Sequence, residues 1–254
     1  MSRHTLAAAL TALHEPGNPV VLYNIWDAGS ALAVIHAGAN AIATGSASVA
    51  AAHGYDDGEQ LPLSSLRATI ERITATVAVP VSVDMESGYG ESAEQVGETA
   101  VALAGAGAVG CNFEDQRIGD DSLYTIAEQC QRLIGIRKAL ADDDLPMHIN
   151  ARTDLFLKQP DDSKHTGLIE AAIDRASAYA DAGADSFFVP WLADLRVIEQ
   201  LCAAVNLPIN VMWRDGLPPI KELAEVGVAR VSFGPGPYRQ AMAELEAAAT
   251  RLYR

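Results

Sequence analysis

The sequence predicts an α/β protein built as a (β/α)8 barrel, also called a TIM barrel, and three observations predict it. Eight short apolar runs alternate with longer Ala-rich runs whose apolar residues recur three and four positions apart. Several longer runs end in a glycine directly before the next short run. No linker rich in proline or serine divides the 254 residues, and barrels of this kind reach ~250 residues as one domain. We therefore expect residues 1–254 to form a single barrel domain.

The eight short runs are expected to be parallel strands, because they are nearly continuously apolar, as strands buried on both faces are. They span residues 20–25, 41–44, 81–84, 109–113, 148–152, 186–189, 209–212 and 230–233. An open doubly wound sheet is the alternative arrangement. The even spacing of eight strands favours the barrel.

The longer runs are expected to be helices. The clearest cover residues 94–103, 123–140, 169–182 and 193–205. A glycine stands before the next strand at four junctions, which are Gly38, Gly107, Gly183 and Gly227. Glycine there supplies the left-handed conformation that ends a helix. Residues 3–15 are expected to form an extra helix at the start, and residues 240–253 an amphipathic helix at the end.

Composition excludes several classes of protein. The chain has 18 Lys plus Arg against 33 Asp plus Glu, a formal charge of −15, which argues against a surface that binds nucleic acid. A hydrophobic content of 49% contradicts disorder, and no stretch approaches the ~18 consecutive apolar residues of a membrane span. The three cysteines are scattered, without CxxC spacing, so we expect neither a disulfide framework nor a thiolate metal site. A reducing cytoplasm is the expected location.

Acidic residues gather at the carboxyl ends of the expected strands, where barrel enzymes place their active sites. Asp84 and Glu86 are two residues apart, so strand alternation predicts that both point toward one centre. Glu114 ends the neighbouring strand. Three carboxylates at one place need a cation or a proton, and oxygen ligands without thiols favour Mg²⁺, with Mn²⁺ as the alternative. The competing interpretation is that one or two of them cap helix N-termini.

A series of motifs in the first two thirds of the chain carries a family resemblance. The strongest are residues 84–90 (DMESGYG), 112–115 (NFED) and 150–154 (NARTD), supported by residues 24–31 (NIWDAGSA), 45–46 (GS) and 54–58 (GYDDG). With these motifs the chain resembles the isocitrate lyase/phosphoenolpyruvate mutase superfamily. The resemblance implies a Mg²⁺-dependent barrel enzyme that acts on small 2-oxo or 2-hydroxy carboxylates.

The resemblance also implies roles for individual acidic residues. Asp84 would hold the metal, directly or through water, with Glu86 and Glu114 in the surrounding shell. Asp57 would join that shell through water. The residues expected to be catalytic are Asp57, Glu114, Arg152 and Tyr89. The candidates for the acid/base among all residues are Tyr89, Glu114, Arg117 and His53.

The substrate contacts implied by the resemblance lie on other strand ends. The turn of Gly45, Ser46 and Ala47 would offer N–H groups and a hydroxyl to the substrate's carboxylate and carbonyl. Arg152 would pair with a substrate carboxylate, because its planar fork matches two oxygens. Trp26 would cover the apolar side of the substrate.

Asn210 interrupts an apolar strand and has two interpretations. One is a substrate contact, and the other is a hydrogen bond within the barrel.

Departures from the family pattern narrow the expected reaction. The stretch 115–122 after the fourth strand has no Cys, His or Lys, which the isocitrate lyases and phosphoenolpyruvate mutases carry in that region. The predicted function is therefore a lyase that cleaves a C–C bond, or a P–C bond, or decarboxylates, through an enolate. Phosphoenolpyruvate phosphonomutase or phosphonopyruvate hydrolase is the first alternative, and a barrel that binds 2-oxo acids without catalysis is the second. The resemblance further implies a homodimer or homotetramer whose C-terminal helix is exchanged between subunits.

Overall fold

A curled, mostly parallel β-sheet organises the computed structural model, which describes residues 1–120 and 122–253. The strands of those residues are β1 (His14–Glu15), β2 (Asn18–Leu22), β3 (Ile42–Ala43), β4 (Val81–Asp84), β5 (Gly110–Glu114), β6 (His148–Arg152), β7 (Ser186–Val189), β8 (Ile209–Met212) and β9 (Val228–Ser232). They are ordered β1-β2-β9-β8-β7-β6-β5-β4-β3, and only β1 pairs antiparallel to its neighbour. The eight expected parallel strands are therefore confirmed as β2 to β9.

The sheet curls so far that its two outer parallel strands approach each other. Just beyond β2, Ile25 forms a parallel bridge with Thr44 beyond β3, and the Ile25 N–H donates to the Ala43 carbonyl at 2.9 Å. The carboxyl ends of β2 and β3 thus meet across a seam held by far fewer hydrogen bonds than the register of β5 with β6.

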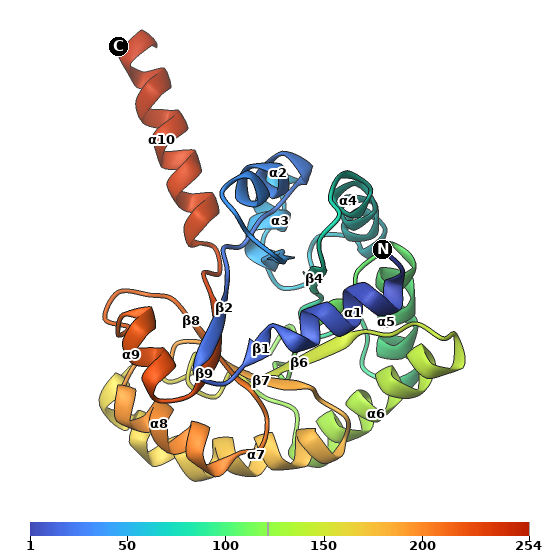
Figure 1. Ribbon diagram of the computed structural model, residues 1–254, viewed down its shortest axis with the longest axis vertical. Helices are drawn as coiled ribbons and strands as arrows, with labels where there is room; N and C mark the ends of the chain where they lie inside the picture. The colour runs from blue at the N-terminus through green and yellow to red at the C-terminus, as the bar shows by residue number, and fades with distance from the viewer. Residues whose placement is uncertain (121, 254) are drawn as a thin grey trace.

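Helices surround the sheet and alternate with the strands along the chain. They are α1 (Arg3–Ala12), α2 (Ala28–His36), α3 (Ser46–Ala52), α4 (Leu63–Thr76), α5 (Ala93–Gly105), α6 (Ile126–Asp142), α7 (Ile169–Asp181), α8 (Leu195–Ala204), α9 (Ile220–Glu225) and α10 (Gly236–Tyr253), with a 3₁₀ segment η1 (Asp162–Leu168) before α7. Figure 1 shows α6, α7 and α8 along the lower edge, while α10 extends away from the rest of the molecule and carries the C-terminus. No helix of the described residues is long and apolar enough to cross a membrane.

The helix ends follow the expected chemistry. Gly107 has φ +104°, in the left-handed region, and a Cβ there would lie 2.6 Å from the Thr74 hydroxyl. Only glycine meets both conditions, so the turn from α5 into β5 depends on it. Asp27 caps α2 by accepting from the Ser30 N–H at 2.7 Å.

The first helix is shorter than predicted. It ends at Ala12, and His14–Glu15 instead pair antiparallel with β2. The cause is the tight turn at Pro16-Gly17, where Gly17 has φ +83°, because that turn returns the chain directly into β2. Leu10 of α1 is fully buried among Leu22 and Val109, so α1 covers the amino-terminal end of the sheet.

The strands are buried on both faces, but the two faces differ in chemistry. Outward positions such as Val83, Ile149 and Phe187 join the apolar core under the helices. The inner face carries a buried polar set, made of Ser82, Asp84, Asn112, Glu114, His148, Asn150, Ser186, Asn210, Arg230 and Ser232. The expectation of nearly continuous apolar strands is therefore wrong for the inner face. Polar side chains can be buried there because they satisfy one another by hydrogen bonds.

Candidate active site at the carboxyl ends of the strands

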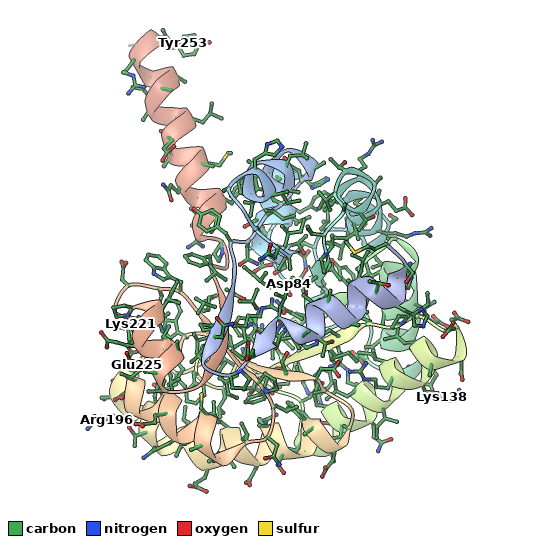
Figure 2. All side chains as sticks on the ribbon, viewed as in Figure 1. Asp84, Lys138, Arg196, Lys221, Glu225 and Tyr253 are labelled. Carbon is green, nitrogen blue, oxygen red and sulfur yellow. The ribbon has the colours of Figure 1, made fainter. Side chains whose placement is uncertain are left out.

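A cavity of about 240 Å³ lies at the carboxyl ends of the parallel strands. Its polar wall consists of Asn24, Gly45, Ser46, Ala47, Asp57, Asp84, Asn112, Arg152, Ser232 and Arg239. Its apolar wall consists of Leu157, Phe188, Pro190, Trp191, Met212 and Pro235, with Gly234 at the junction. Figure 2 shows Asp84 near the centre of the molecule, far from peripheral side chains such as Lys138 and Arg196.

Asp84, the last residue of β4, is buried at the cavity. Its Oδ2 accepts from the Ser46 N–H at 3.1 Å, and its own N–H donates to the Thr44 hydroxyl at 2.9 Å. Its Oδ1 is buried without a hydrogen-bond partner in the described residues. Burial raises the pKa of Asp84, against the opposing influence of Arg152. A buried carboxylate oxygen without a donor is costly unless a cation or proton meets it.

Glu86 lies close to Asp84, but not by strand alternation. The strand ends at Asp84, and Glu86 adopts φ +51° in the following turn, which corrects the expectation that both residues point from one strand. Its Oε2 accepts from the N–H groups of Gly58 and Glu59 at 2.8 and 2.7 Å. Burial, then the nearby Asp57 and Asp84 charges, raise the pKa of Glu86 to about 7.

Tyr89 stands beside this turn, also in the left-handed region with φ +55°. Its hydroxyl donates to Glu86 Oε1 at 3.4 Å. Burial and then the Glu86 charge raise its pKa, so the phenol is protonated at neutral pH. The structure thus places Tyr89 against Glu86 rather than among the residues that line the cavity.

Glu114 and Arg152 form an ion pair at the ends of β5 and β6. Arg152 Nη1 lies 2.8 Å from Glu114 Oε2, and Asp154 takes two further donors of the same guanidinium at 2.5 and 2.9 Å. Burial raises the pKa of Glu114, an effect that Arg152 opposes, while the charges of Asp154 and Glu114 raise the pKa of Arg152 against burial. Arg152 is a fixed cation in the cavity wall.

A second ion pair supports this arginine from behind. Asp115 accepts from the Asp154 N–H at 3.0 Å, and from Arg175 and the Tyr179 hydroxyl at 2.9 Å each. Asp154 is thus held through its carboxylate by Arg152 and through its N–H by Asp115.

The three carboxylates expected to surround one cation have different partners in the structure. In residues 1–120 and 122–253, no group of three Asp, Glu, His or Cys side chains is placed to hold a metal ion. Glu114 is engaged by Arg152 and Glu86 by backbone N–H groups. Of the three, Asp84 has the buried oxygen without a hydrogen-bond partner, and the metal-holding roles of all three stay a prediction.

The turn before α3 brings its backbone to the same cavity. Gly45, Ser46 and Ala47 all line it. The Ser46 N–H is used by Asp84, whereas the Ser46 hydroxyl and the Ala47 N–H are not hydrogen-bonded to any described residue. These two groups are free to meet a ligand.

Two predicted substrate contacts lie elsewhere. Trp26 lines a second hollow, between α2 and α10, and packs edge-on against Tyr238 at 5.1 Å between ring centroids. Asn210 is fully buried on the inner face, where its amide exchanges hydrogen bonds with Ser232 at 3.2 and 3.3 Å. Asp57 does line the cavity.

The sequence did not single out Arg230, Arg239 or the side chain of Asn112 as functional. Arg239, in the first turns of α10, lines the cavity, and Arg230 is buried below it. One signal was available: a lone arginine inside a strand that is otherwise apolar, as at Arg230, is costly without a purpose.

Comparisons with known proteins agree on one relationship. Residues 10–253 match the family model described as phosphoenolpyruvate phosphomutase. The 2-methylisocitrate lyase of Escherichia coli is 32% identical, over 91% of this chain and 78% of that one. A phosphonomutase-like structure from Burkholderia cenocepacia J2315 is 45% identical with a TM-score of 0.95, covering 98% and 99% of the two chains.

A more distant structure shares the fold. It is a phosphonopyruvate hydrolase solved with oxalate and Mg²⁺, 21% identical with a TM-score of 0.85, covering 100% of this chain and 88% of that one.

Proposed function

This chain belongs to the phosphoenolpyruvate phosphomutase family, within the isocitrate lyase/phosphoenolpyruvate mutase superfamily, and we propose that it is a Mg²⁺-dependent lyase for a small 2-oxo or 2-hydroxy carboxylate. The proposed reaction cleaves or decarboxylates beyond the α-carbon and leaves an enolate. The single observation that carries the proposal is the buried Asp84 Oδ1, which has no donor among the described residues and belongs to a residue that lines the cavity.

The residues present fit Mg²⁺. Mg²⁺ keeps several waters and is usually held by one or two carboxylates plus its substrate, so one unpaired carboxylate beside a 240 Å³ cavity suits it better than a closed cage of protein ligands. Asp84 would hold the ion, with Asp57, Glu86 and Glu114 around it. When bound, the ion would polarise the substrate's carbonyl and stabilise the negative charge that develops on that oxygen. The phosphonopyruvate hydrolase with oxalate and Mg²⁺ supports this choice.

The chain's own groups bind and orient the substrate. Arg152 is held by Glu114 and Asp154, so its charge stays fixed at the cavity and attracts a carboxylate. The Ser46 hydroxyl and the Ala47 N–H donate to oxygens on the other side. Preorganised donors of this kind stabilise an oxyanion without having to reorient.

Two features favour C–C over P–C chemistry. The apolar wall of Phe188, Met212 and Trp191 suits the carbon substituents of a branched acid better than a phosphonate. Gln116 stands directly after the Glu114-Asp115 pair, where phosphoenolpyruvate mutases carry a lysine. The proton is proposed to move at Glu86 or Glu114, whose pKa values burial raises.

Turnover of a small panel tests the proposal. Oxaloacetate, malate-type acids, methylisocitrate and phosphonopyruvate are offered with Mg²⁺, with and without a chelator. We expect turnover of at least one member, lost with the chelator and in D84N. The matched control is D142N, which removes the exposed partner of Lys138 and is expected to keep full activity. Binding of these acids without turnover would favour the non-catalytic alternative.

We further infer that the curled sheet is a (β/α)8 barrel with α1 as its extra helix, and that α10 is exchanged between subunits of a dimer or tetramer. In α10, Leu245, Leu252 and Tyr253 are 63, 83 and 87% exposed, and Figure 1 shows the helix extended away from the body. Sedimentation of the full chain tests the oligomeric state, and a monomer at micromolar concentration would contradict the inferred dimer or tetramer.

A further inference from the structure

A buried polar layer lies directly below the cavity and has no part in the mechanism described so far. Its members are neighbours in the strand register: Asn112 pairs with Asn150, Asn150 with Ser186, and Asn210 with Arg230. Asp84 pairs with Asn112 in the same way. The layer therefore reaches from the interior of the sheet to the carboxylate at the cavity.

Arg230 is the one guanidinium of this layer, and it is fully buried. Its Nη2 donates to Asn112 Oδ1 at 3.2 Å and its Nε to the Ser232 hydroxyl at 3.1 Å, while Nη1 has no partner in the described residues. Within those residues Arg230 forms no salt bridge. Its hydrogen bonds go only to neutral side chains, and the charge of Asp84 at the cavity is the main influence that opposes the lowering of its pKa by burial. Arg230 is therefore linked electrostatically to the cavity above it.

Asn112 is oriented by these contacts without ambiguity. Arginine is a donor only, so the Asn112 atom that faces Arg230 must be the carbonyl oxygen. Asn150 Nδ2 donates to the same oxygen at 2.9 Å, and the Asn150 oxygen is itself fixed by the Ser186 hydroxyl at 2.7 Å. The amide oxygen is thus held by two donors, and the Asn112 NH₂ group, which has no hydrogen-bond partner in the described part of the chain, is left for a residue that lines the cavity.

We propose that Asn112 is a substrate-binding residue whose NH₂ group donates to an oxygen of the bound carboxylate, and that Arg230 is the positioning residue that holds the amide in this orientation. The ligand class is an anion that presents oxygen acceptors, as a 2-oxo carboxylate does. This inference rests on the proposed function, because it assigns a further contact to the same substrate.

The chemistry of the neighbours supports an anionic oxygen as the acceptor. The cavity wall has the cationic side chains of Arg152 and Arg239 and the carboxylates of Asp57 and Asp84, so a divalent cation at Asp84 would shift the balance of charge in favour of an anion. Asn112 is the neighbour of Asp84 in the strand register. A ligand that chelates a cation at Asp84 would therefore bring its oxygens close to the NH₂ group of Asn112. An aspartate at position 112 would present an acceptor there and repel the ligand.

The proposal is tested by measuring oxalate binding to the full chain by calorimetry, with Mg²⁺ at a saturating concentration. We expect N112D to weaken oxalate binding at least tenfold, because it exchanges the donor for a negative charge. The matched control is N206D, which adds the same charge at an exposed position before β8 and is expected to leave oxalate binding unchanged. Unchanged oxalate binding in N112D would overturn the inference.

The positioning role of Arg230 is tested by asking whether the effect of its substitution on oxalate binding requires Asn112. R230M is expected to weaken oxalate binding three- to tenfold when Asn112 is present, and to have no further effect when combined with N112A. Equal weakening in both backgrounds would overturn the positioning role. Mg²⁺ binding without oxalate is measured in parallel, since loss of the metal alone would show a merely structural effect.

A spectroscopic readout keeps the test independent of whether R230M folds. The side-chain NH₂ resonances of Asn112, assigned by their loss in N112D, are expected to shift when Mg²⁺ and oxalate are added to the wild-type protein. Oxalate binding with no such shift would contradict the contact. If the wild-type protein bound no oxalate at all, the proposed function itself would fail, which separates that outcome from failure of this inference.

Discussion

The two ends of the curled sheet bury titratable side chains in opposite ways. At the amino-terminal end, under α1, the rings of His14 and His148 stack with centroids 4.1 Å apart. Burial lowers the pKa of His14 to about 2 and that of His148 to about 3. At the carboxyl end, burial raises the pKa of Asp84 and Glu86. The same desolvation acts at both ends, and in each case it favours the neutral form.

The difference lies in what each end does with that neutral form. His148 can remain neutral because its Nε2–H donates to the Ser186 hydroxyl at 2.9 Å, whose own proton goes to Asn150, while its Nδ1 accepts from the Thr11 hydroxyl at 3.1 Å. The carboxyl groups lie at a cavity beside Arg152, where the charged form is useful if a cation arrives. The amino-terminal end is sealed under α1, although His14 Nε2 has no partner there among the described residues, whereas the carboxyl end opens to a cavity that a ligand can enter. In barrels of this kind the amino-terminal end serves stability and the carboxyl end carries the active site.

The largest test of this comparison is removal of the unpaired carboxylate. D84N is expected to reduce turnover of the substrate found in the panel on the order of 10²–10³-fold, as loss of a single electrostatic stabiliser does. Without Mg²⁺ its melting temperature is expected to rise, because the variant no longer buries an unpaired carboxylate. Calorimetric melting and initial rates measure both effects. A variant with lower stability and full activity would remove Asp84 from the functional end.

The sealed end predicts a loss of stability in acid. Because the folded-state pKa values of His14 and His148 lie below the unfolded value of 6.5, the unfolded chain binds more protons. The contribution of these two histidines to stability is therefore complete above pH 6.5 and falls as the pH drops below it, by about 1.4 kcal/mol per pH unit for each histidine. The raised pKa of Glu86, about 7, acts in the opposite direction over this range, so the total slope is smaller than the histidine contribution.

Thermal unfolding between pH 6.5 and pH 5 checks this. H14F keeps a stacking ring without a titratable group and is expected to remove the share of one histidine, about 1.4 kcal/mol per pH unit. The control is H4Q at an exposed histidine, which should leave the slope as it is. A slope in H14F equal to that of the wild-type protein would exclude His14 as a source.

The open end predicts stabilisation by the missing cation. If Mg²⁺ binds the folded chain at Asp84, unfolding should become less favourable by about 2.7 kcal/mol at a Mg²⁺ concentration one hundred times the dissociation constant. A thermal shift titration with MgCl₂ measures this, with NaCl at equal ionic strength as the control. The same stabilisation in D84N would place the ion elsewhere.

The smallest expected effect comes from a single bond at the sealed end. T11A removes the hydroxyl that contacts His148 Nδ1 at 3.1 Å and is expected to cost about 1 kcal/mol of unfolding free energy. Activity should not change, because the carboxyl-end cavity is lined by other residues. Chemical denaturation gives the energy, and a loss of turnover in T11A would show that the two ends are coupled.

Sequence reasoning succeeded where a residue's role is local. The eight strands follow from periodicity, and the glycine before β5 from the helix end that it forms. Asp84 lies at the cavity, as its place at the end of an apolar strand predicts. Glu86 lies near Asp84 for a reason other than the predicted one, since strand alternation does not continue through a residue with φ +51°.

Long-range partnerships were beyond the sequence. Asn112 and Arg230 are 118 positions apart and meet only because β5 and β9 face each other across the curled sheet. Glu114 is turned toward Arg152 by a pairing of β5 with β6, which no single motif contains. The destination of Trp26 depends on where α10 lies, and that is set by tertiary packing.

The polar inner face has a consequence for how the strands choose their alignment. A strand that slipped by one residue would exchange its inner and outer side chains, so Asn150 would enter the apolar layer beneath the helices and Ile149 would face Asn112. Apolar packing alone tolerates several such alignments, whereas the chain of bonds from Ser186 through Asn150 to Asn112 forms in one alignment alone. The buried amides therefore fix the register of these strands, and the position of the cavity above them depends on that register.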